Sequence, residues 1–265
     1  MMGLSHCRRN LLTTLEGYKY PYMDLFFIRH GESSNNALVN NTSGNHETDA
    51  PQRVSDPPLT ERGRRQADCL GPFLARGGHL DPQERESGPP LHELFCSPML
   101  RTLETARPAV DALGLQPKVW VDVHEVGGVW QEGIDRCTGL SRADVETQLP
   151  GAIIPQEIGT NGWWTSGQET AAAGLGRASA VATELRARAA RRHQAGGPAE
   201  RVAIVSHGDF MSCIVKAFAD HLPSPAIYYS HSNTGIDRFR LDGNVLRILY
   251  LNRIDHLDRP DLVSP

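Results

Sequence analysis

The stretch "FFIRHGESSNN", from Phe26 to Asn36, places a cation and an imidazole directly after an apolar run. The run that contains its first residues, Met23–Ile28 ("MDLFFI"), is typical of a strand buried on both faces. In an open α/β sheet, ligands bind in the crevice beyond the carboxyl ends of the strands. The sequence therefore predicts a ligand site where this strand ends, at Arg29 and His30.

Strand and helix patterns alternate along the rest of the chain. Further strands are predicted at Glu93–Cys96, Lys118–Val123 and Arg201–Ser206, and helices at 59–77 with Thr60 as N-cap, at 97–114 and at 167–194. A last pair of segments, 235–243 and 244–252, surrounds Asp242-Gly243, which is a hairpin turn signal. We therefore predict an α/β fold, a three-layer α/β/α sandwich with a mostly parallel central sheet and an antiparallel edge.

Two polar connections, 37–58 and 133–162, are long for a compact domain. Each follows a segment that we interpret as catalytic, so both are candidate lids or substrate loops. Disordered insertions are the alternative interpretation. Trp130, Trp163 and Trp164 lie in or beside these connections, where they could stack on a sugar or base or could serve packing alone.

Composition indicates one globular unit. The chain has 265 residues, of which 39% are hydrophobic and 22% are charged, as is ordinary for a soluble protein. We predict a flexible N-terminal extension at 1–22 and a single catalytic domain at 23–265. Met1 and Met23 both stay open as the start of translation. No run approaches the roughly 18 consecutive apolar residues that a membrane helix needs, so we expect no membrane partner.

Charge and cysteine content narrow the location and the partners. The formal net charge of −4 and the pI near 6.3 carry no electrostatic signature of nucleic-acid binding. The five cysteines include no CxxC pair, which favours free thiols, a reducing compartment and a cytoplasmic location. We expect no nucleic-acid partner, and a homodimer stays open.

Three predicted strands end in the same kind of chemistry. The residues that follow them are Arg29-His30-Gly31, Ser97-Pro98 with Arg101 one helical turn later, and Ser206-His207-Gly208. If the strands are parallel neighbours, two histidines and two arginines meet at one edge of the sheet. Three strand ends that share this pattern are hard to explain by chance.

Such a cluster suits a tetrahedral oxyanion. A guanidinium presents a planar fork of donors that matches phosphate oxygens. Helix N-termini after Gly31 and Gly208 would add backbone N–H groups that face the same anion. A neutral imidazole, with an unperturbed pKa of about 6.5, is a competent nucleophile toward phosphorus. The cluster therefore predicts a phosphorylated histidine.

Four motifs in order resemble one known family. They are "RHGESSNN" from Arg29, "LTERGRRQA" from Leu59, "SPMLRTLETA" from Ser97 and "SHGDF" from Ser206. The chain resembles the histidine phosphatase superfamily, in the RHG branch that includes the cofactor-dependent phosphoglycerate mutases. The resemblance covers Met23 to Asn252 and implies a phosphoglycerate mutase-like fold.

The resemblance also implies a role for each matched residue. His30 would attack the phosphoryl group and hold it covalently, while Arg29, Arg101 and His207 would bind its oxygens. Asn36, six positions after His30, corresponds to the phosphate-binding asparagine of the family. The implied activity is that of a metal-independent phosphomonoesterase that needs no cofactor and acts on a small-molecule phosphomonoester.

The family also has a proton donor shortly after its third strand. "DVHEVGG" offers Glu125, which would protonate the leaving alkoxide and then take a proton from the hydrolytic water. Glu132 and His124 are near in sequence and keep this assignment open. The roles of two other residues are open as well: Ser97 could orient His30 or only cap its helix, and Glu32 could serve the site or a turn.

Departures from the family pattern separate its members. Asn35 stands where the mutases have a tryptophan, and the spacer before Leu59-Thr60 is much longer, which favours hydrolysis over mutase activity. The further arginine and the late His-Asp pair of the acid phosphatases are missing, and Asp209 suits the first turn of a helix better than an acid role. Arginines that could meet a second acidic group of the substrate are Arg53, Arg136 and Arg142.

Two rival functions stay open. A metal-dependent hydrolase would use His30, His124, Glu125 and His207 as ligands, but flanking arginines would repel a divalent cation and no HExxH spacing occurs. A non-catalytic phosphate or phosphoprotein binder would use the same pocket without turnover. The presence of every expected reactive side chain argues against that second rival.

Overall fold

The computed structural model of the chain describes residues 22–41, 53–221, 224, 226–243 and 245–265. Its strands are β1 (Met23–Arg29), β2 (Glu93–Cys96), β3 (Lys118–Val119), β4 (Glu200–Ser206), β5 (Ile236–Asp242) and β6 (Val245–Arg253). Its helices are α1 (Ser34–Asn41), α3 (Glu61–Ala75), α4 (Pro82–Arg85), α5 (Leu100–Leu113), α6 (Arg142–Gln148), α7 (Ala171–Gln194) and α8 (Gly208–Phe218), with 3₁₀ turns η2 (Val121–Val123) and η3 (Pro260–Leu262). The N-terminal extension predicted at 1–22 lies, apart from Tyr22, outside the described residues.

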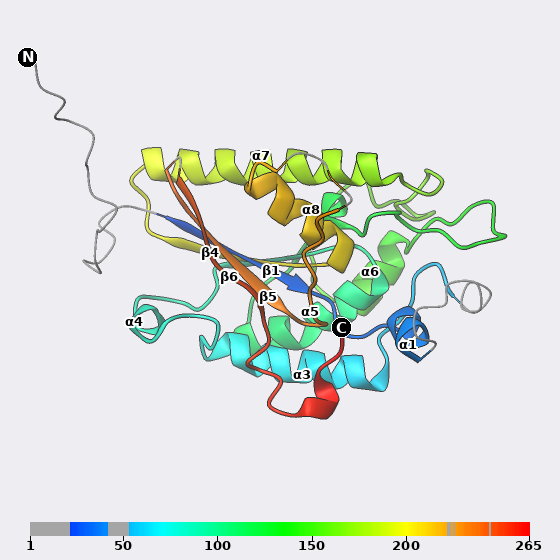
Figure 1. The fold of residues 1–265 in the computed structure, drawn as a ribbon, viewed down its shortest axis with the longest axis horizontal. Coiled ribbons are helices and arrows are strands. Elements are labelled where there is room, and N and C mark those ends of the chain that lie inside the picture. Colours follow the sequence, from blue (N-terminus) through cyan, green and yellow to red (C-terminus); the bar gives the residue numbers. More distant parts are fainter. Residues whose placement is uncertain (1–21, 42–52, 222–223, 225, 244) are drawn as a thin grey trace, which may run out of the picture.

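One six-stranded sheet forms the centre of the molecule, in the order β3-β2-β4-β1-β5-β6. The strands β3, β2, β4 and β1 are parallel, whereas β5 is antiparallel to both β1 and β6. Helices α7 and α8 cover one face of the sheet, and α3 and α5 cover the other (Figure 1). The predicted three-layer α/β/α sandwich with an antiparallel edge is therefore confirmed.

Alternation along β1 fills both layers of the core. Met23, Leu25 and Phe27 pack into the cluster that contains the buried residues of α7 and α8. Phe26 and Ile28 point the other way, into the cluster that contains the buried residues of α3 and α5. Burial of each such side chain contributes roughly 1.5–3 kcal/mol. Asp24, the polar residue of this run, is fully buried as well and pairs with two arginines of β5.

The strand register brings the three predicted motifs to one edge. Arg29 of β1 lies opposite Ser206 of β4. The N–H of His30 donates to the carbonyl of Ser206 at 2.9 Å, and that of Ser97 donates to Val205 at 3.1 Å. The residues that follow β1, β2 and β4 are thus neighbours in space, as the sequence predicts.

The strand predicted at Lys118–Val123 is too long. Only Lys118 and Val119 pair with β2, and the chain then forms the turn η2. The hydroxyl of Ser206 donates to the carbonyl of Val123 at 2.8 Å, which holds this turn over the carboxyl ends of the strands. Because the chain leaves the sheet after Val119, Glu125 lies close to the site.

Both long connections contain helices that are absent from the predicted elements. Helix α1 extends into the first connection as far as Asn41, and residues 42–52 lie outside the described part of the chain. Helix α6 lies in the second and begins with a capping box, in which Ser141 and Asp144 bond each other's backbone N–H groups. Short helices whose first turn is satisfied locally need no strong apolar stripe, so periodicity does not reveal them.

The loop after β1 packs closely on the first turn of α3. Thr60 caps this helix by accepting from the N–H of Gly63 at 3.0 Å, and its own N–H donates to the carbonyl of Glu32 at 2.9 Å. A Cβ atom at Gly63 would lie 2.1 Å from the Glu32 carbonyl oxygen, and one at Gly31 would lie 2.6 Å from the Gly63 oxygen. Glycine at both positions permits this contact.

We expect Gly63→Ala to lower the free energy of unfolding by about 1–3 kcal/mol, because the added methyl group forces two packed backbones apart. The midpoint of urea unfolding measures this loss. The control is Gly176→Ala in α7, where a Cβ meets nothing within 4 Å. Replacing this helical glycine should raise stability by about 0.5–1 kcal/mol. Stabilisation by both substitutions would contradict the close packing.

Candidate active site

His30 lies in the loop after β1, almost fully buried, with a defined tautomer. Its Nδ1 lies 2.6 Å from the carbonyl of Gly31, which can only accept, so Nδ1 carries the proton. Its Nε2 accepts a hydrogen bond from Arg101 Nε at 3.1 Å and therefore bears the lone pair. Burial and the charges of Arg101 and Arg29 lower the pKa of His30 well below 6.5. A neutral ring with a free Nε2 lone pair is the form that a nucleophile requires.

Two arginines flank this imidazole. Arg101 comes from the first turn of α5 and also pairs with Asp56, whose Oδ1 lies 3.5 Å from Arg101 Nη1. Arg29 is the last residue of β1, and its Nη1 donates to the carbonyl of His231. The buried Nε of Arg29 has no hydrogen-bond partner among the described residues. Unused donors beside a neutral imidazole suit an anion that arrives with the substrate.

His207, the N-cap of α8, stands behind His30 with the two ring centroids 5.2 Å apart. Its Nε2 lies 2.8 Å from Ser97 Oγ. That hydroxyl also accepts from the N–H of Met99, and it can donate its own hydrogen to Nε2, an arrangement that places the proton of His207 on Nδ1. Nδ1 has no partner among the described residues. Ser97 therefore orients His207, and the alternative in which it orients His30 is wrong.

Asn36 lies on α1 and presents its amide to the same cavity. Its Oδ1 accepts from the N–H and the hydroxyl of Ser33, at 3.2 and 3.0 Å, and from Asn233 Nδ2 at 3.4 Å. Three donors on the oxygen fix the orientation of the amide, so its NH₂ group is the part left to bind a ligand.

Glu125 sits between η2 and α8, and its carboxyl group is partly buried. Its Oε1 accepts from the N–H of Val126 at 2.9 Å and from that of Phe210, in the first turn of α8, at 3.0 Å. Burial and the neighbouring charge of Asp209 raise the pKa of Glu125 to about 7. With Oε1 accepting two bonds, a proton on this group resides on Oε2. A carboxyl group with a pKa near neutrality can act as both acid and base.

The segment that carries Glu125 is held by Arg177 of α7. Its Nη1 donates to the carbonyls of Asp122 and His124, each at 2.8 Å. Its guanidinium also pairs with Glu169 at 2.6 Å and lies over the ring of Phe210. A buried cation thus fixes the loop that presents the acid.

The predicted helix N-termini differ in what they contribute. Gly208 is the first residue of α8 and lines the cavity, and a Cβ there would lie only 3.2 Å from Arg29 Nε. Gly31 does not begin a helix, because α1 starts at Ser34 and the N–H of Gly31 donates to Thr105 Oγ1 at 3.0 Å. Of the two glycines, only Gly208 therefore starts a helix at the cavity, where N–H groups can meet an anion.

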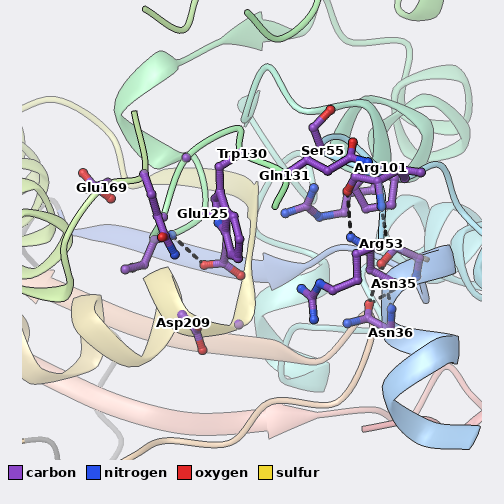
Figure 2. Close-up of a pocket in the computed structure, with 18 of the residues that line it drawn as sticks. Asn35, Asn36, Arg53, Ser55, Arg101, Glu125, Trp130, Gln131, Glu169 and Asp209 are labelled. Carbon is purple, nitrogen blue, oxygen red and sulfur yellow. Dashed lines mark hydrogen bonds between the residues drawn. The ribbon is translucent and has the colours of Figure 1, made fainter. Parts of the chain in front are cut away.

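These residues surround a cavity of about 470 Å³, within the range of small-molecule sites. Most of the predicted residues line it, namely Arg29, His30, Asn36, Arg101, Glu125 and Gly208. His207 is fully buried behind this wall. Figure 2 shows Glu125, Glu169 and Asp209 on one side of the space and Arg53, Arg101, Asn35 and Asn36 on the other.

Several residues that hold Arg29 and His30 in place were not predicted from the sequence. His231 Nε2 lies 2.7 Å from Asp237 Oδ2, and this pair holds the carbonyl that binds Arg29. Asn233 Nδ2 donates to the carbonyl of His30 at 3.1 Å, and its Oδ1 accepts from Ser264 Oγ at 2.9 Å. These residues lie in irregular segments, and no local pattern marks them.

Other candidates lie outside the cavity. Trp163 and Trp164 pack in the core, where the ring of His124 contacts both. Glu32 accepts from Thr60 and Arg62 at the start of α3, and so serves the fold. Trp130, in contrast, lines the cavity and is 38% exposed, so it alone of the three tryptophans can meet a ligand.

The three arginines predicted to meet a second acidic group of the substrate do not all line the cavity. Arg142 binds the carbonyls of Ile154, Pro155 and Ile158, and Arg136 is exposed away from the cavity, so of the three only Arg53 lines it.

Within the described ranges, no group of three or more His, Cys, Asp or Glu residues is arranged as a metal site. In the same ranges, no helix has the length and apolarity to cross a membrane.

Comparison with known proteins agrees with this geometry. Residues 25–254 match the profile of the histidine phosphatase superfamily (branch 1), and the chain therefore belongs to this superfamily. No curated protein matches the chain.

Solved structures share the fold at low sequence identity. A phosphoserine phosphatase mutant from Entamoeba histolytica, in complex with phosphoserine, is 18% identical, with a TM-score of 0.53 over 89% of this chain and 99% of that one. A mycobacterial glucosyl-3-phosphoglycerate phosphatase is 19% identical, with a TM-score of 0.52 over 87% and 99% of the two chains. A phosphoglycerate mutase from Bacillus anthracis is 15% identical, with a TM-score of 0.52 over 90% and 96%. These likenesses confirm the phosphoglycerate mutase-like fold.

Proposed function

We propose that this protein is a phosphomonoesterase that hydrolyses a small phosphorylated metabolite through a covalent phosphohistidine at His30. One observation carries the proposal. The Nε2 lone pair of His30 lies in a cavity lined by two arginines, which also contains a carboxyl group, Glu125, with a pKa near 7. A nucleophile, oxyanion donors and a proton donor are the parts that phosphoryl transfer requires.

In the first step, His30 Nε2 attacks phosphorus and the bond from phosphorus to the ester oxygen breaks. The electron pair of that bond stays on the oxygen, which takes the proton of Glu125 and leaves as an alcohol. Arg29 and Arg101 donate to the phosphoryl oxygens, where negative charge gathers, and we assign the same role to His207, whose ring lies beside that of His30. These donors are fixed before substrate binds, so little reorganisation is needed.

In the second step, water replaces the alcohol. Glu125, now a carboxylate, takes a proton from this water while the water oxygen attacks phosphorus. The bond from phosphorus to Nε2 breaks, which returns His30 to its neutral form and releases inorganic phosphate. The N–H proton of His30 stays on Nδ1 throughout, held by the carbonyl of Gly31. The cycle therefore restores every protein group.

Two named phosphatases among the structural neighbours favour hydrolysis. The mutase neighbour raises the alternative that the phosphoryl group returns to an organic acceptor. A mutase must keep its phosphohistidine from water. The observation that favours hydrolysis is the open space in front of His30, which is large enough for water beside a departed alcohol.

The test is a screen over sugar phosphates, nucleotides, phosphoglycerates and phosphoamino acids, read as released inorganic phosphate. For the best substrate, a ³²P-labelled reaction is quenched rapidly in alkali. We expect label on the peptide that contains His30, stable in alkali and lost in acid. A mutase would label the protein without net phosphate release. A non-catalytic binder would show neither label nor release, and inhibition by EDTA would indicate a metal-dependent hydrolase.

A further inference from the structure

A third arginine, Arg53, lines the cavity, and the proposed phosphoryl transfer does not use it. Arg29 and Arg101 each donate to a protein acceptor, the carbonyl of His231 and Nε2 of His30. Across residues 22–41, 53–221 and the later described stretches, no hydrogen bond or ion pair engages the Arg53 guanidinium. A fork of five donors in a binding cavity is thus left for a ligand.

The segment 53–58 that carries Arg53 is fixed at several points. The amide of Asn35 pairs with the backbone of Val54, donating to its carbonyl at 2.9 Å and accepting from its N–H at 3.2 Å. Asp56 accepts from the N–H of Leu100 with both oxygens, at 3.1 and 3.2 Å. The N–H of Ser34 donates to the carbonyl of Pro58 at 3.0 Å. The backbone next to Arg53 is therefore held against α1 and α5.

Charge is divided across the cavity. Arg53 and Arg101 lie on one side, together with the amides of Asn35 and Asn36, and Glu125, Glu169 and Asp209 lie on the other (Figure 2). Glu169 on that far side already pairs with Arg177 at 2.6 Å. Burial lowers the pKa of Arg101, the charges of Asp56 and Glu125 raise it, and the charge of Arg53 lowers it. An anion beside Arg53 would offset this repulsion between two cations.

We infer that Arg53 is a specificity-determining residue that binds a second acidic group, a carboxylate or a phosphate, on the leaving alcohol of the substrate. The inference rests on the proposed phosphomonoesterase function. It narrows the substrate class to phosphomonoesters whose alcohol is itself an anion. A charge-assisted, bidentate contact of this kind discriminates by about 10- to 100-fold.

The test uses substrates that differ in one group. 3-Phosphoglycerate and glycerol 3-phosphate have the same skeleton, with a carboxylate in the first and a hydroxymethyl group in the second. We expect the native enzyme to favour 3-phosphoglycerate in kcat/KM by about 10- to 100-fold, and Arg53→Gln to remove most of this preference. Arg53→Lys should keep part of it. The matched control is Arg136→Gln, an exposed arginine outside the cavity, which should leave the preference unchanged.

A second pair separates the two kinds of acidic group. Fructose 1,6-bisphosphate and fructose 6-phosphate differ by one phosphate, so a preference within this pair that Arg53→Gln removes identifies phosphate as the ligand. Equal losses on all four substrates would overturn the inference, because Arg53 would then bind the transferred phosphoryl group itself. No loss on any of them would overturn it too.

Binding measured without turnover separates this inference from the proposed function. Calorimetry gives the Kd of 3-phosphoglycerate for His30→Ala and for His30→Ala/Arg53→Gln. A Kd that is at least tenfold higher for the double variant supports the inference about Arg53, even if no substrate is hydrolysed. In that case only the proposed function fails. Equal binding by both variants, together with normal hydrolysis by the native enzyme, overturns the inference about Arg53 alone.

Discussion

Replacement of His30 by alanine is expected to lower kcat by at least about 10⁴-fold, because it removes the atom that forms the covalent intermediate. The donors that bind the phosphoryl oxygens remain, so KM should change far less than kcat. The fold should persist, since the imidazole bonds only Gly31 and Arg101 among the described residues. Steady-state hydrolysis of p-nitrophenyl phosphate measures the rate, and thermal unfolding by circular dichroism measures the fold.

A buried histidine far from the chemistry serves as the control for this change. His79 is fully buried, contacts the ring of Phe26 edge-on at 4.6 Å, and does not line the cavity. His79→Ala should lower the unfolding temperature yet keep kcat at temperatures where the protein is folded. If the His30→Ala protein is folded and retains more than about a hundredth of the native rate, nucleophilic catalysis by His30 is wrong.

Glu125→Gln is expected to lower kcat/KM for alkyl phosphates by about 10²- to 10⁴-fold, the usual contribution of general acid catalysis. The amide oxygen can still accept from the N–H groups of Val126 and Phe210, so the geometry is kept. The loss in kcat/KM for p-nitrophenyl phosphate should be small, because its phenolate leaves without a proton. Its hydrolysis should instead show a burst of nitrophenol, since Glu125 is also the base for the second step.

The pH profile tests the same role independently. In the proposed mechanism the protonated form of Glu125 is the acid, and burial raises its pKa to about 7. The kcat/KM for an alkyl phosphate should therefore fall as pH rises above about 7, and Glu125→Gln should lack this fall. Taking the ratio of the two enzymes at each pH removes the ionisation of the substrate. Glu132→Gln, which changes another carboxylate of the cavity, should keep the native profile; loss of the alkaline fall in that variant would move the acid role to Glu132.

The fold and the gathering of Arg29, His30, Arg101 and His207 follow from the sequence for a physical reason. Strands buried on both faces must be apolar runs, so β1, β2 and β4 agree with the predicted segments to within one residue at each end. Parallel strands share one carboxyl edge, so the residues after β1, β2 and β4 had to meet there. The superfamily and the three-layer sandwich are confirmed on this basis, while the roles of the individual site residues stay predictions.

What sequence reasoning missed depends on contacts between distant segments. Asp56 meets Arg101 only because the segment 53–58 is tied to α1 and α5, and this tie uses side-chain amides and backbone groups without periodicity. The support of Arg29 by His231 and Asp237 joins a loop to β5 in the same way. The turn η2 was not predicted, because an apolar segment at the edge of a sheet can stop pairing with its neighbour without any change in composition.

The bond between Phe210 and Glu125 joins two parts of the molecule that are usually considered separately. The N–H of Phe210 holds the carboxyl group, while its ring is buried between the sheet and α7 beneath Arg177. A substitution among these apolar contacts that shifts α8 by a fraction of an ångström would change the solvation of Glu125. A substitution in the hydrophobic core can thus change the pH optimum of this protein, although every residue that lines the cavity stays the same.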